Sequence, residues 1–458
     1  MPPAPAELAQ HLTAHGQEHI LHGWDRLSDA ERTVLIEQVT GINFGALHDL
    51  YTAHDTAPAA LPPRSAIGPL PVLPRAATPE AHAIGEEALR RGEVAVLLVA
   101  GGQGSRLGFD QPKGMYPVGP VSKATLFQVH AEKVLAVSRR YGRPVPFLVM
   151  TSQATHSETE AFFRANNFFG LAPEDVVFFR QGTMPAVDIA TGRLLLEAPG
   201  KLFLSPNGHG GTLTALRETG TLAQMQARGI RHVFYFQVDN PLVKVCDPDF
   251  LGNHIRAESE ASSKVVYKEQ PGEKVGILAV VNGRCAIVEY SDLPAEMAAE
   301  RTEDGTLRFR AGNPAIHLFD LGFLERVTGA GGLTYHVARK KVPHLDPATG
   351  DYVSPTKENA LKFELFIFDA LPMADRWVAM ETSREEEFAP LKNATGADSP
   401  ETVHRAMSAL HASWLRRAGA TVPEGAAVEI SPLFALDPEE CGRKMAPGTQ
   451  VSASAYFR

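Results

Sequence analysis

The chain has 458 residues, a length that accommodates two or three domains, and 44% of them are hydrophobic. This apolar content is enough for a large buried core and excludes global disorder. The formal net charge of -9 excludes a general nucleic-acid or anionic-membrane surface, because such surfaces need a basic excess.

Cysteine usage predicts a reducing compartment. The chain contains Cys246, Cys285 and Cys441, an odd number without a Cys-x-x-Cys pair, so neither a disulfide framework nor a thiolate zinc site is expected. Residues 1–17 lack a basic stretch followed by an apolar one, and no apolar run reaches the ~20 residues that span a bilayer. We therefore expect a cytoplasmic protein that binds neither nucleic acid nor membranes, whereas the oligomeric state stays open.

The first 90 residues are predicted to form a helical segment followed by a proline-rich connector. Residues 5–55 have helical character, and Ser28 with Glu31 has the spacing of a capping box at a helix N-terminus. Residues 56–79 contain seven prolines, so we expect an extended connector there instead of a regular element.

From residue 91 the pattern changes to alternating strands and helices. Short apolar runs predict strands at Val94–Ala100, Pro146–Thr151, Val176–Phe179, His232–Val238, Lys264–Lys268 and Val275–Val281; helical patterns lie at Ala124–Tyr141 and Thr155–Asn166. We expect Thr155 and Glu158 to form the capping box of the second helix. This alternation predicts an α/β fold, with a mainly parallel mixed sheet that carries helices on both faces.

The C-terminal part, residues 391–458, is predicted to be a small separate domain. It contains an expected helix at Pro400–Ala418 and expected strands at Ala427–Ile430 and Gln450–Ala455. Residues 91–390 then form the central domain.

A glycine-rich loop follows the first strand of that central domain. It begins with Gly101 and contains Arg106 and Lys113. Glycines allow backbone amides to fold around a phosphate, so this is a candidate phosphate loop with two cations. It is not a Walker A loop, and Leu107 replaces the third glycine of a dinucleotide fingerprint.

The loop resembles that of the UDP-sugar pyrophosphorylases, most closely the UDP-N-acetylglucosamine pyrophosphorylase branch. That branch opens its catalytic domain with Gly-Gly-x-Gly-(Thr/Ser)-Arg-Leu-Gly and then Pro-Lys-Gly. The resemblance continues in order through residues 178–185, 206–211, 238–240, 288–291, 312–313, 362–369 and 388–393. It covers roughly residues 90 to 395 and implies a nucleotide-diphospho-sugar transferase core, similar to glycosyltransferase A, at 91–390.

The resemblance implies a uridylyltransferase that joins UTP to a sugar-1-phosphate and releases pyrophosphate. The attacking phosphate is already an anion, so catalysis should depend on positioning and on cations. We expect Arg106, Lys113 and Lys392 to be catalytic, as ligands of the phosphates. Asp239 ends an apolar strand, a common position for a ligand of Mg²⁺, with Mn²⁺ as the other candidate; the alternative for Asp239 is a helix cap or turn.

The resemblance also implies the residues that bind the substrates. Ala100, Gly101, Gly102 and Gly104 at the glycine-rich loop are assigned to substrate binding, and the uracil base to Gln181, Met184, Pro185 and Gly208. The sugar is assigned to Gly276, Glu289, Asn313, Phe366 and Phe368, with Tyr290 as a brace and His209 close to the sugar and its phosphate. For one of the two phenylalanines the alternative is an ordinary core position. The histidines show no His-x-x-x-His pattern with a third ligand, so a catalytic zinc is not expected.

His209 leaves the identity of the sugar open. The acetylglucosamine branch usually has Asp-Gly-Asn-Gly-Gly at this motif, whereas Gly-His-Gly is similar to the glucose and broad-specificity enzymes. We expect N-acetylglucosamine 1-phosphate as substrate, with glucose or galactose 1-phosphate as the alternative. Two other classes remain. The presence of Arg106, Lys113, Asp239 and Lys392 favours the transferase over a non-catalytic nucleotide-sugar sensor, and Leu107 with the cation pair beyond the loop counts against a nicotinamide-dependent oxidoreductase.

Overall fold

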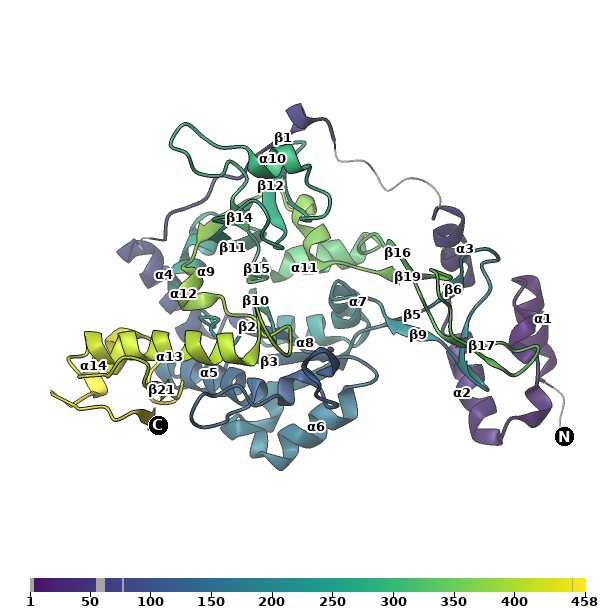
Figure 1. The fold of residues 1–458 in the computed structure, drawn as a ribbon, viewed down its shortest axis with the longest axis horizontal. Coiled ribbons are helices and arrows are strands. Elements are labelled where there is room, and N and C mark those ends of the chain that lie inside the picture. Colours follow the sequence, from purple (N-terminus) through teal and green to yellow (C-terminus); the bar gives the residue numbers. More distant parts are fainter. Residues whose placement is uncertain (1–3, 55–61, 76–77, 447) are drawn as a thin grey trace. The chain divides into compact units, whose positions relative to one another are not determined.

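The computed structural model describes residues 4–54, 62–75, 78–446 and 448–458. They form two compact units, and segments far apart in the sequence contribute to each (Figure 1). The first unit comprises Met1–Leu61, Gln181–Thr212 and Leu333–Ile367, and the second comprises Pro62–Arg180, Leu213–Gly332 and Phe368–Arg458.

The first unit begins with three helices, α1 (Ala6–Ala14), α2 (Asp29–Thr40) and α3 (Phe44–Thr52). The predicted capping box is confirmed, because the Ser28 hydroxyl accepts from the Glu31 amide and the Ser28 amide donates to the Glu31 carboxylate. Leu35 and Val39 of α2 are fully buried in one apolar cluster with Val187 and Leu361. The helices therefore share a core with strands that lie far away in the sequence.

The strands of the first unit form small sheets. One has the order β16 (His336–Lys340), β19 (Ala360–Glu364), β6 (Val187–Asp188); a second has β18 (Tyr352–Val353), β17 (His344–Leu345), β7 (Leu196–Ala198), β8 (Lys201–Leu202); and β5 (Thr183–Pro185) pairs with β9 (Leu204–Pro206). The antiparallel pairing of β19 with β6 joins the second and third segments of this unit.

An 11-stranded mixed sheet forms the centre of the second unit. Its strands run in the order β1 (Ile67–Pro69), β12 (Ile277–Val281), β14 (Ala311–Gly312), β11 (Ala261–Tyr267), β15 (His317–Asp320), β10 (His232–Gln237), β2 (Val94–Val99), β3 (Phe147–Thr151), β4 (Val176–Arg180), with β13 (Arg284–Val288) beside β12 and β20 (Trp377–Glu381) beside β11. Strands β10, β2, β3 and β4 are parallel, as is the β11–β20 pair, whereas β15 is antiparallel to both of its neighbours.

Helices cover this sheet, and the side chains of β10 show how. Phe234 and Phe236 belong to the apolar cluster that contains residues of α4 (Pro79–Arg91), α5 (Leu126–Tyr141), α6 (His156–Ala165) and α9 (Pro248–Arg256). Tyr235 points the other way and meets Phe319, whose ring stacks on Phe323 of α11 (Leu321–Gly329). The alternation along one buried strand therefore places apolar side chains on both faces of the sheet.

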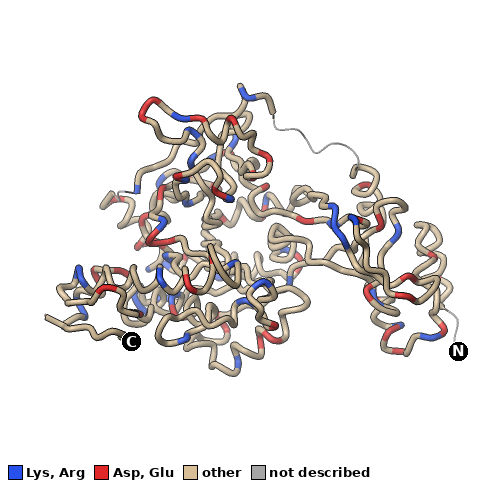
Figure 2. Tube along the Cα trace, viewed as in Figure 1, with Lys and Arg blue, Asp and Glu red and all other residues tan. Residues whose placement is uncertain are grey.

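The remaining helices are α7 (Gly211–Glu218), α8 (Thr221–Ala227), α10 (Ala295–Ala299), α12 (Arg384–Glu387), α13 (Pro400–Arg417) and α14 (Pro438–Lys444). The last two, with the parallel strands β21 (Ala427–Ile430) and β22 (Ser454–Phe457), form the C-terminal part of the second unit. Figure 2 shows acidic and basic residues interspersed along these C-terminal helices.

Three local predictions were wrong. Thr155 does not cap α6, because its hydroxyl accepts from the Ser152 amide instead. Part of the proline-rich connector is the edge strand β1, where Pro69 is tolerated at a strand end; residues 55–61 and 76–77 lie outside the described chain. The last strand, β22, begins four residues later than predicted, at Ser454 instead of Gln450.

The division into units differs from the three consecutive segments that the sequence suggested. The reason is the pairing of strands that are far apart in the sequence, such as β6 with β19. Because of this pairing, residues 181–212 and 333–367 belong to the first unit and not to the predicted central domain. Among the described helices, none is both long enough and apolar enough to cross a membrane.

Candidate active site

The glycine-rich loop is a closed structure at the carboxyl end of β2. The Lys113 amide donates to the Gly102 carbonyl at 3.0 Å, and the Gly104 amide donates to the Gln111 carbonyl at 2.9 Å. A side chain at Gly104 would collide with Phe109, whose atoms lie 2.7 Å from the position of a Cβ, whereas Gly102 faces open space. The loop therefore needs glycine at 104 to close and leaves the backbone at 102 accessible to a ligand.

Leu107 explains why this loop departs from a dinucleotide fingerprint. It is buried in the main apolar cluster, so the short turn Ser105–Leu107 is anchored to the core. Arg106 on the same turn is exposed, and its guanidinium has no hydrogen-bond or ion-pair partner within the described residues. The cation is thus available to a ligand while its backbone is fixed.

Lys113, Asp239 and Leu391 meet where two parallel strands end. The carboxyl ends of the neighbouring strands β2 and β10 bring the loop and Asp239 together, as predicted. The ammonium of Lys113 lies 4.0 Å from the Asp239 carboxylate and donates to the Leu391 carbonyl at 3.4 Å. The Leu391 amide donates to the Asp239 carbonyl at 2.8 Å, which holds the loop that carries Lys392 beside the strand end.

A pocket of about 270 Å³ opens beside Asp239. Its lining includes six residues that the sequence singled out, Asp239, Gly276, Glu289, Tyr290, Asn313 and Lys392, and also Gln237, Asn240, Lys274 and Phe388. The structure thus brings the predicted metal ligand, one predicted phosphate ligand and most of the predicted sugar ligands to one cavity.

The sugar-binding candidates are held by short backbone contacts. The Asn313 amide donates to the Gly276 carbonyl at 2.9 Å, and the Asn313 side chain accepts from the Ala315 amide at 2.9 Å. A Cβ at Gly276 would lie 3.2 Å from a carboxylate oxygen of Glu289, so a larger residue would push that side chain aside. Tyr290 is 48% exposed, which fits a residue at the rim of the pocket.

Lys274 is a pocket residue that the sequence analysis missed. It follows Glu273, whose carboxylate accepts from the backbone amides of Glu269 and Gln270 and pairs with Arg384 at 2.7 Å. Burial raises the pKa of Glu273, but these amides and the guanidinium lower it below its ordinary value. The loop is therefore anchored by an ionised carboxylate. The only feature of the sequence that could have pointed to Lys274 as a pocket residue is its place two positions before Gly276.

A buried charge network supports the other side of the pocket. Glu387 accepts from Lys264, from Thr382 at 2.6 Å and from the Lys244 amide at 3.2 Å, and its carbonyl accepts from the Asn240 side chain at 2.7 Å. Because Asn240 follows Asp239, and Glu387 precedes the Lys392 loop, one residue fixes both segments that carry candidate phosphate and metal ligands.

The residues assigned to the uracil base lie together in the first unit. Gln181 is buried, and its side-chain amide has no hydrogen-bond partner within the described part of the chain. Met184 and Pro185 follow on β5, which pairs with β9, and the Asn207 amide donates to the Gly182 carbonyl at 3.0 Å. The side-chain amide of Gln181 is thus available for a polar partner, and the apolar residues Met184 and Pro185 follow it three and four positions later.

Gly208 and His209 lie against the chain at 365–367 in the same unit. A Cβ at Gly208 would be 2.4 Å from the Leu365 carbonyl oxygen, and Gly208 has a φ of 83°, so the position requires glycine. The His209 ring accepts from the Ile367 amide at 3.2 Å and stacks on Phe366 with 5.5 Å between the ring centres. The boundary between the two units falls between Phe366 and Phe368, after Ile367.

The residues around Asp239 fit a magnesium ion that is held mainly by its substrate. Within the described residues no group of three His, Cys, Asp or Glu side chains could hold a metal ion. Asp239 is only 14% exposed and offers carboxylate oxygens close to Lys113. Mg²⁺ is commonly bound by one or two carboxylates together with substrate phosphates and waters, and such a site needs no further protein ligand.

Comparison with known proteins agrees with this geometry. Residues 66–434 match the family model described as UTP--glucose-1-phosphate uridylyltransferase. The chain is 38% identical to the UDP-N-acetylglucosamine pyrophosphorylase of Saccharomyces cerevisiae over 91% of this chain and 92% of that protein. It is 39% identical to the UDP-N-acetylhexosamine pyrophosphorylase-like protein 1 of Homo sapiens over 93% and 88% of the two chains.

A solved structure extends the similarity to the whole chain. The uridine diphosphate N-acetylglucosamine pyrophosphorylase of Trypanosoma brucei aligns with a TM-score of 0.84 and 29% identity, over 100% of this chain and 98% of that one. The match of the family model over most of the chain, together with relatives that are similar along nearly their full length, shows that the chain belongs to the UTP–glucose-1-phosphate uridylyltransferase family.

Proposed function

We propose that the protein is a uridylyltransferase that forms UDP-N-acetylglucosamine and pyrophosphate from UTP and N-acetylglucosamine 1-phosphate. The observation that carries this proposal is the meeting of Lys113, Asp239 and the Lys392 loop beside the pocket of Glu289 and Asn313. The names of the similar pyrophosphorylases support the choice of the acetylated sugar.

The cations of the site account for catalysis without a general base. The phosphate of the sugar is already anionic, so the protein must bring two polyanions together and stabilise the leaving pyrophosphate. Lys113 is held at the strand end by the Leu391 carbonyl, whereas Lys392 is 42% exposed and its ammonium lies 3.8 Å from Asp398. We assign Lys113, with Arg106 on the same loop, to the triphosphate and Lys392 to the α-phosphate, and Lys274 adds a further positive charge.

We propose that Asp239 binds Mg²⁺, or Mn²⁺ in its place, together with phosphate oxygens. The ion supplies Lewis-acid neutralisation of the phosphates when it is bound. The ammonium of Lys113 lies 4.0 Å from this carboxylate, which is longer than a hydrogen bond, so the carboxylate oxygens stay accessible to the ion.

Glucose 1-phosphate remains the second candidate substrate, and His209 is the reason. Its ring stacks on Phe366, a residue that the sequence analysis assigns to the sugar, and Gly-His-Gly is similar to the motif of the glucose enzymes. The assignment of uracil to Gln181, a core similar to glycosyltransferase A, and a cytoplasmic location stay predictions.

The proposal is tested by pyrophosphate release from UTP, Mg²⁺ and N-acetylglucosamine 1-phosphate, with the product identified by mass spectrometry. We expect UDP-N-acetylglucosamine from the wild type and at least a hundredfold slower formation with Asp239→Asn, since a lost electrostatic contact in a preorganised site costs about 2.7–4 kcal/mol. Asp375→Asn is the matched control, because Asp375 is an exposed carboxylate that pairs with Arg284 and belongs to neither the pocket nor the phosphate ligands. A wild-type enzyme that releases pyrophosphate without a UDP-sugar would refute the proposal.

A further inference from the structure

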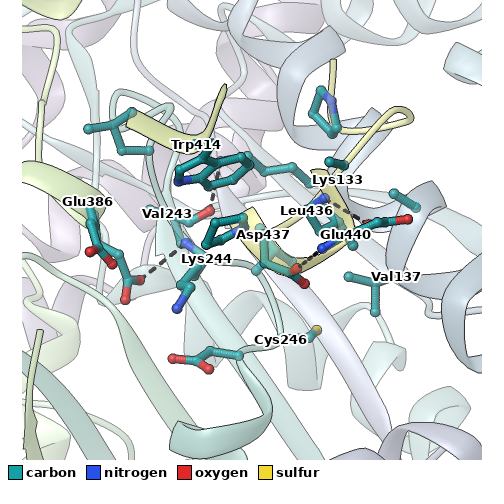
Figure 3. A pocket seen from close by; sticks show the side chains of 18 of the residues that line it. Lys133, Val137, Val243, Lys244, Cys246, Glu386, Trp414, Leu436, Asp437 and Glu440 are labelled. Atoms are coloured by element: carbon teal, nitrogen blue, oxygen red, sulfur yellow. Dashed lines mark hydrogen bonds between the residues drawn. The ribbon is translucent and has the colours of Figure 1, made fainter. Parts of the chain in front are cut away.

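A second and larger cavity lies in the second unit, on the side of the Asp239 segment that carries Val243 and Val245. Its volume is about 980 Å³, at the upper end of the ~300–1,000 Å³ typical of small-molecule sites. Helix α5, residues 241–249, the chain before α12 and the C-terminal helices α13 and α14 all contribute to it. Figure 3 shows Trp414, Val243, Lys133 and Lys244 among the side chains that line it.

The lining combines an apolar surface with charge that lacks a partner. Val137, Val243, Leu436 and the partly buried Trp414 provide the apolar part. A cavity of this composition suits a ligand with an aromatic or aliphatic body, because Trp offers a large flat contact.

The carboxylates of the cavity are already committed to partners. Asp437 and Glu440 both bind Arg140, and Glu439 binds Arg417 at 2.9 Å. Asp247 and Glu387 bind Lys264, whose side chain is 1% exposed. Of the carboxylates that line the cavity in the described chain, Glu381 alone has neither an ion pair nor a hydrogen bond.

Several cations of the cavity, by contrast, have no carboxylate as an ion-pair partner in the part of the chain that the structure describes. Among the described residues, Lys133, Arg139, Lys244 and Arg443 line the cavity without a carboxylate within ion-pair distance. Lys133 instead donates to the carbonyls of Pro241 and Val243 at 2.5 and 2.7 Å, and burial lowers its pKa to about 7 despite the opposing charge of Glu387. Lys133 is thus already bonded to two carbonyls, whereas in the described chain Arg139, Lys244 and Arg443 leave three positive charges without a partner against one such carboxylate, Glu381, so the ligand should be an anion.

The cavity also shares a wall with the active site. Val243 and Lys244 belong to the segment that follows Asp239, and the Lys244 amide donates to Glu387, whose carbonyl holds Asn240. A ligand that displaces this segment would move the metal-binding carboxylate and the Lys392 loop together. The geometry therefore connects occupancy of the cavity with catalysis.

We propose that this cavity is a regulatory site for a small amphipathic anion, a molecule with a carboxylate, sulfonate or phosphate group and an apolar body. The anionic group binds Lys244, the body packs on Trp414 and Val243, and occupancy changes the rate of uridylyl transfer. Binding of the anion does not depend on the proposed reaction, whereas the regulatory role rests on it. A failure of binding is therefore distinguishable from a failure of the proposed function.

Binding is tested with a fluorescent probe, 8-anilinonaphthalene-1-sulfonate, and with N-phenyl-1-naphthylamine, which is the same body without the sulfonate. We expect one saturable site for the sulfonate that UTP with Mg²⁺ does not displace. Lys244→Met should weaken the sulfonate roughly tenfold, as expected for one charge-assisted contact, and leave the neutral probe unchanged. Trp414→Leu should weaken both probes.

Lys201→Met is the matched control, because Lys201 is an exposed lysine of β8 in the other unit and pairs with Glu197. Equal affinities of the wild type and Lys244→Met for the sulfonate, or displacement of the probe by UTP, would overturn the site. Thermal melting of each variant separates loss of a contact from loss of the fold. Transfer rates that are the same with and without saturating sulfonate in the wild type would overturn the regulatory role.

Discussion

Replacing Lys264 by methionine should destabilise the second unit strongly. The side chains of Lys264, Asp247 and Glu387 are only 1%, 6% and 3% exposed, and the ammonium is 2.6 Å from Asp247. Methionine keeps much of the volume and removes the charge, which leaves two buried carboxylates facing each other. Breaking a buried ion pair in this way costs about 3–5 kcal/mol.

The matched control is Arg284→Met, at an exposed pair. Arg284 and Asp375 lie 2.7 Å apart, but their side chains are 49% and 64% exposed. Such pairs contribute about 0–1 kcal/mol, because solvent screens them. Both substitutions remove one cation, but Lys264 pairs with two buried carboxylates and Arg284 with one exposed carboxylate, so the comparison contrasts a buried ion-pair network with an exposed ion pair.

The pH dependence gives an additional prediction. Burial raises the pKa of Asp247, but the charges of Lys264 and Lys244 lower it below its ordinary value, so its contribution is present above the unfolded pKa and is lost as pH falls through the folded one. Burial lowers the pKa of Lys264, but Asp247 and Glu387 raise it above its ordinary value, so its contribution is lost only as pH rises through that higher pKa. Between about pH 5 and pH 9 the contribution of Asp247 and Lys264 to the stability of the wild type is therefore constant.

In Lys264→Met the cation is gone, and burial then raises the pKa of Asp247. The variant gains stability as this carboxyl takes up a proton. The difference in the free energy of unfolding between wild type and variant should therefore shrink from pH 8 to pH 5. Urea unfolding in a Trp24→Phe background measures it, because Trp377 and Trp414 both report on the second unit. A gap below 1 kcal/mol at pH 8, or one that widens on acidification, would refute the argument.

Three further predictions concern the substrates. Lys392→Ala should lower kcat by roughly a hundredfold and also raise KM, since a ligand of the α-phosphate acts in the transition state; a change confined to KM in steady-state assays would make it a ground-state contact only. Gly208→Ala should lose UTP binding in calorimetry, because its Cβ would lie 2.4 Å from the Leu365 carbonyl at a φ of 83°, and wild-type affinity would count against this. His209→Asn should shift the ratio of kcat/KM toward N-acetylglucosamine 1-phosphate over glucose 1-phosphate by roughly ten- to two-hundredfold, and a flat ratio would exclude His209 from specificity.

The sequence was sufficient where a short spacing or a general rule of α/β sheets determines the structure. The capping box of Ser28 and Glu31 follows from a three-residue spacing, and the meeting of Lys113 with Asp239 follows from the rule for parallel strand ends. The pocket of Glu289 and Asn313 was reached through resemblance alone, since nothing in the spacing of those residues indicates that they converge.

The sequence was insufficient where contacts join distant residues. Glu387 and Lys264 are 123 residues apart, so no local pattern could indicate that they share a buried network. The segments that make up the first unit could not be predicted for the same reason, because its second and third segments are joined by strand pairing. At Thr155 the local pattern was present, but the Ser152 amide competed successfully for the hydroxyl.

The most direct test of the proposed function is a panel of sugar-1-phosphates with UTP and Mg²⁺, read out as pyrophosphate release and as the mass of the UDP-sugar. We predict the highest kcat/KM for N-acetylglucosamine 1-phosphate, with turnover dependent on Asp239. A protein that is stabilised by UTP but forms no UDP-sugar from any member of the panel would contradict the proposal and indicate a binding protein.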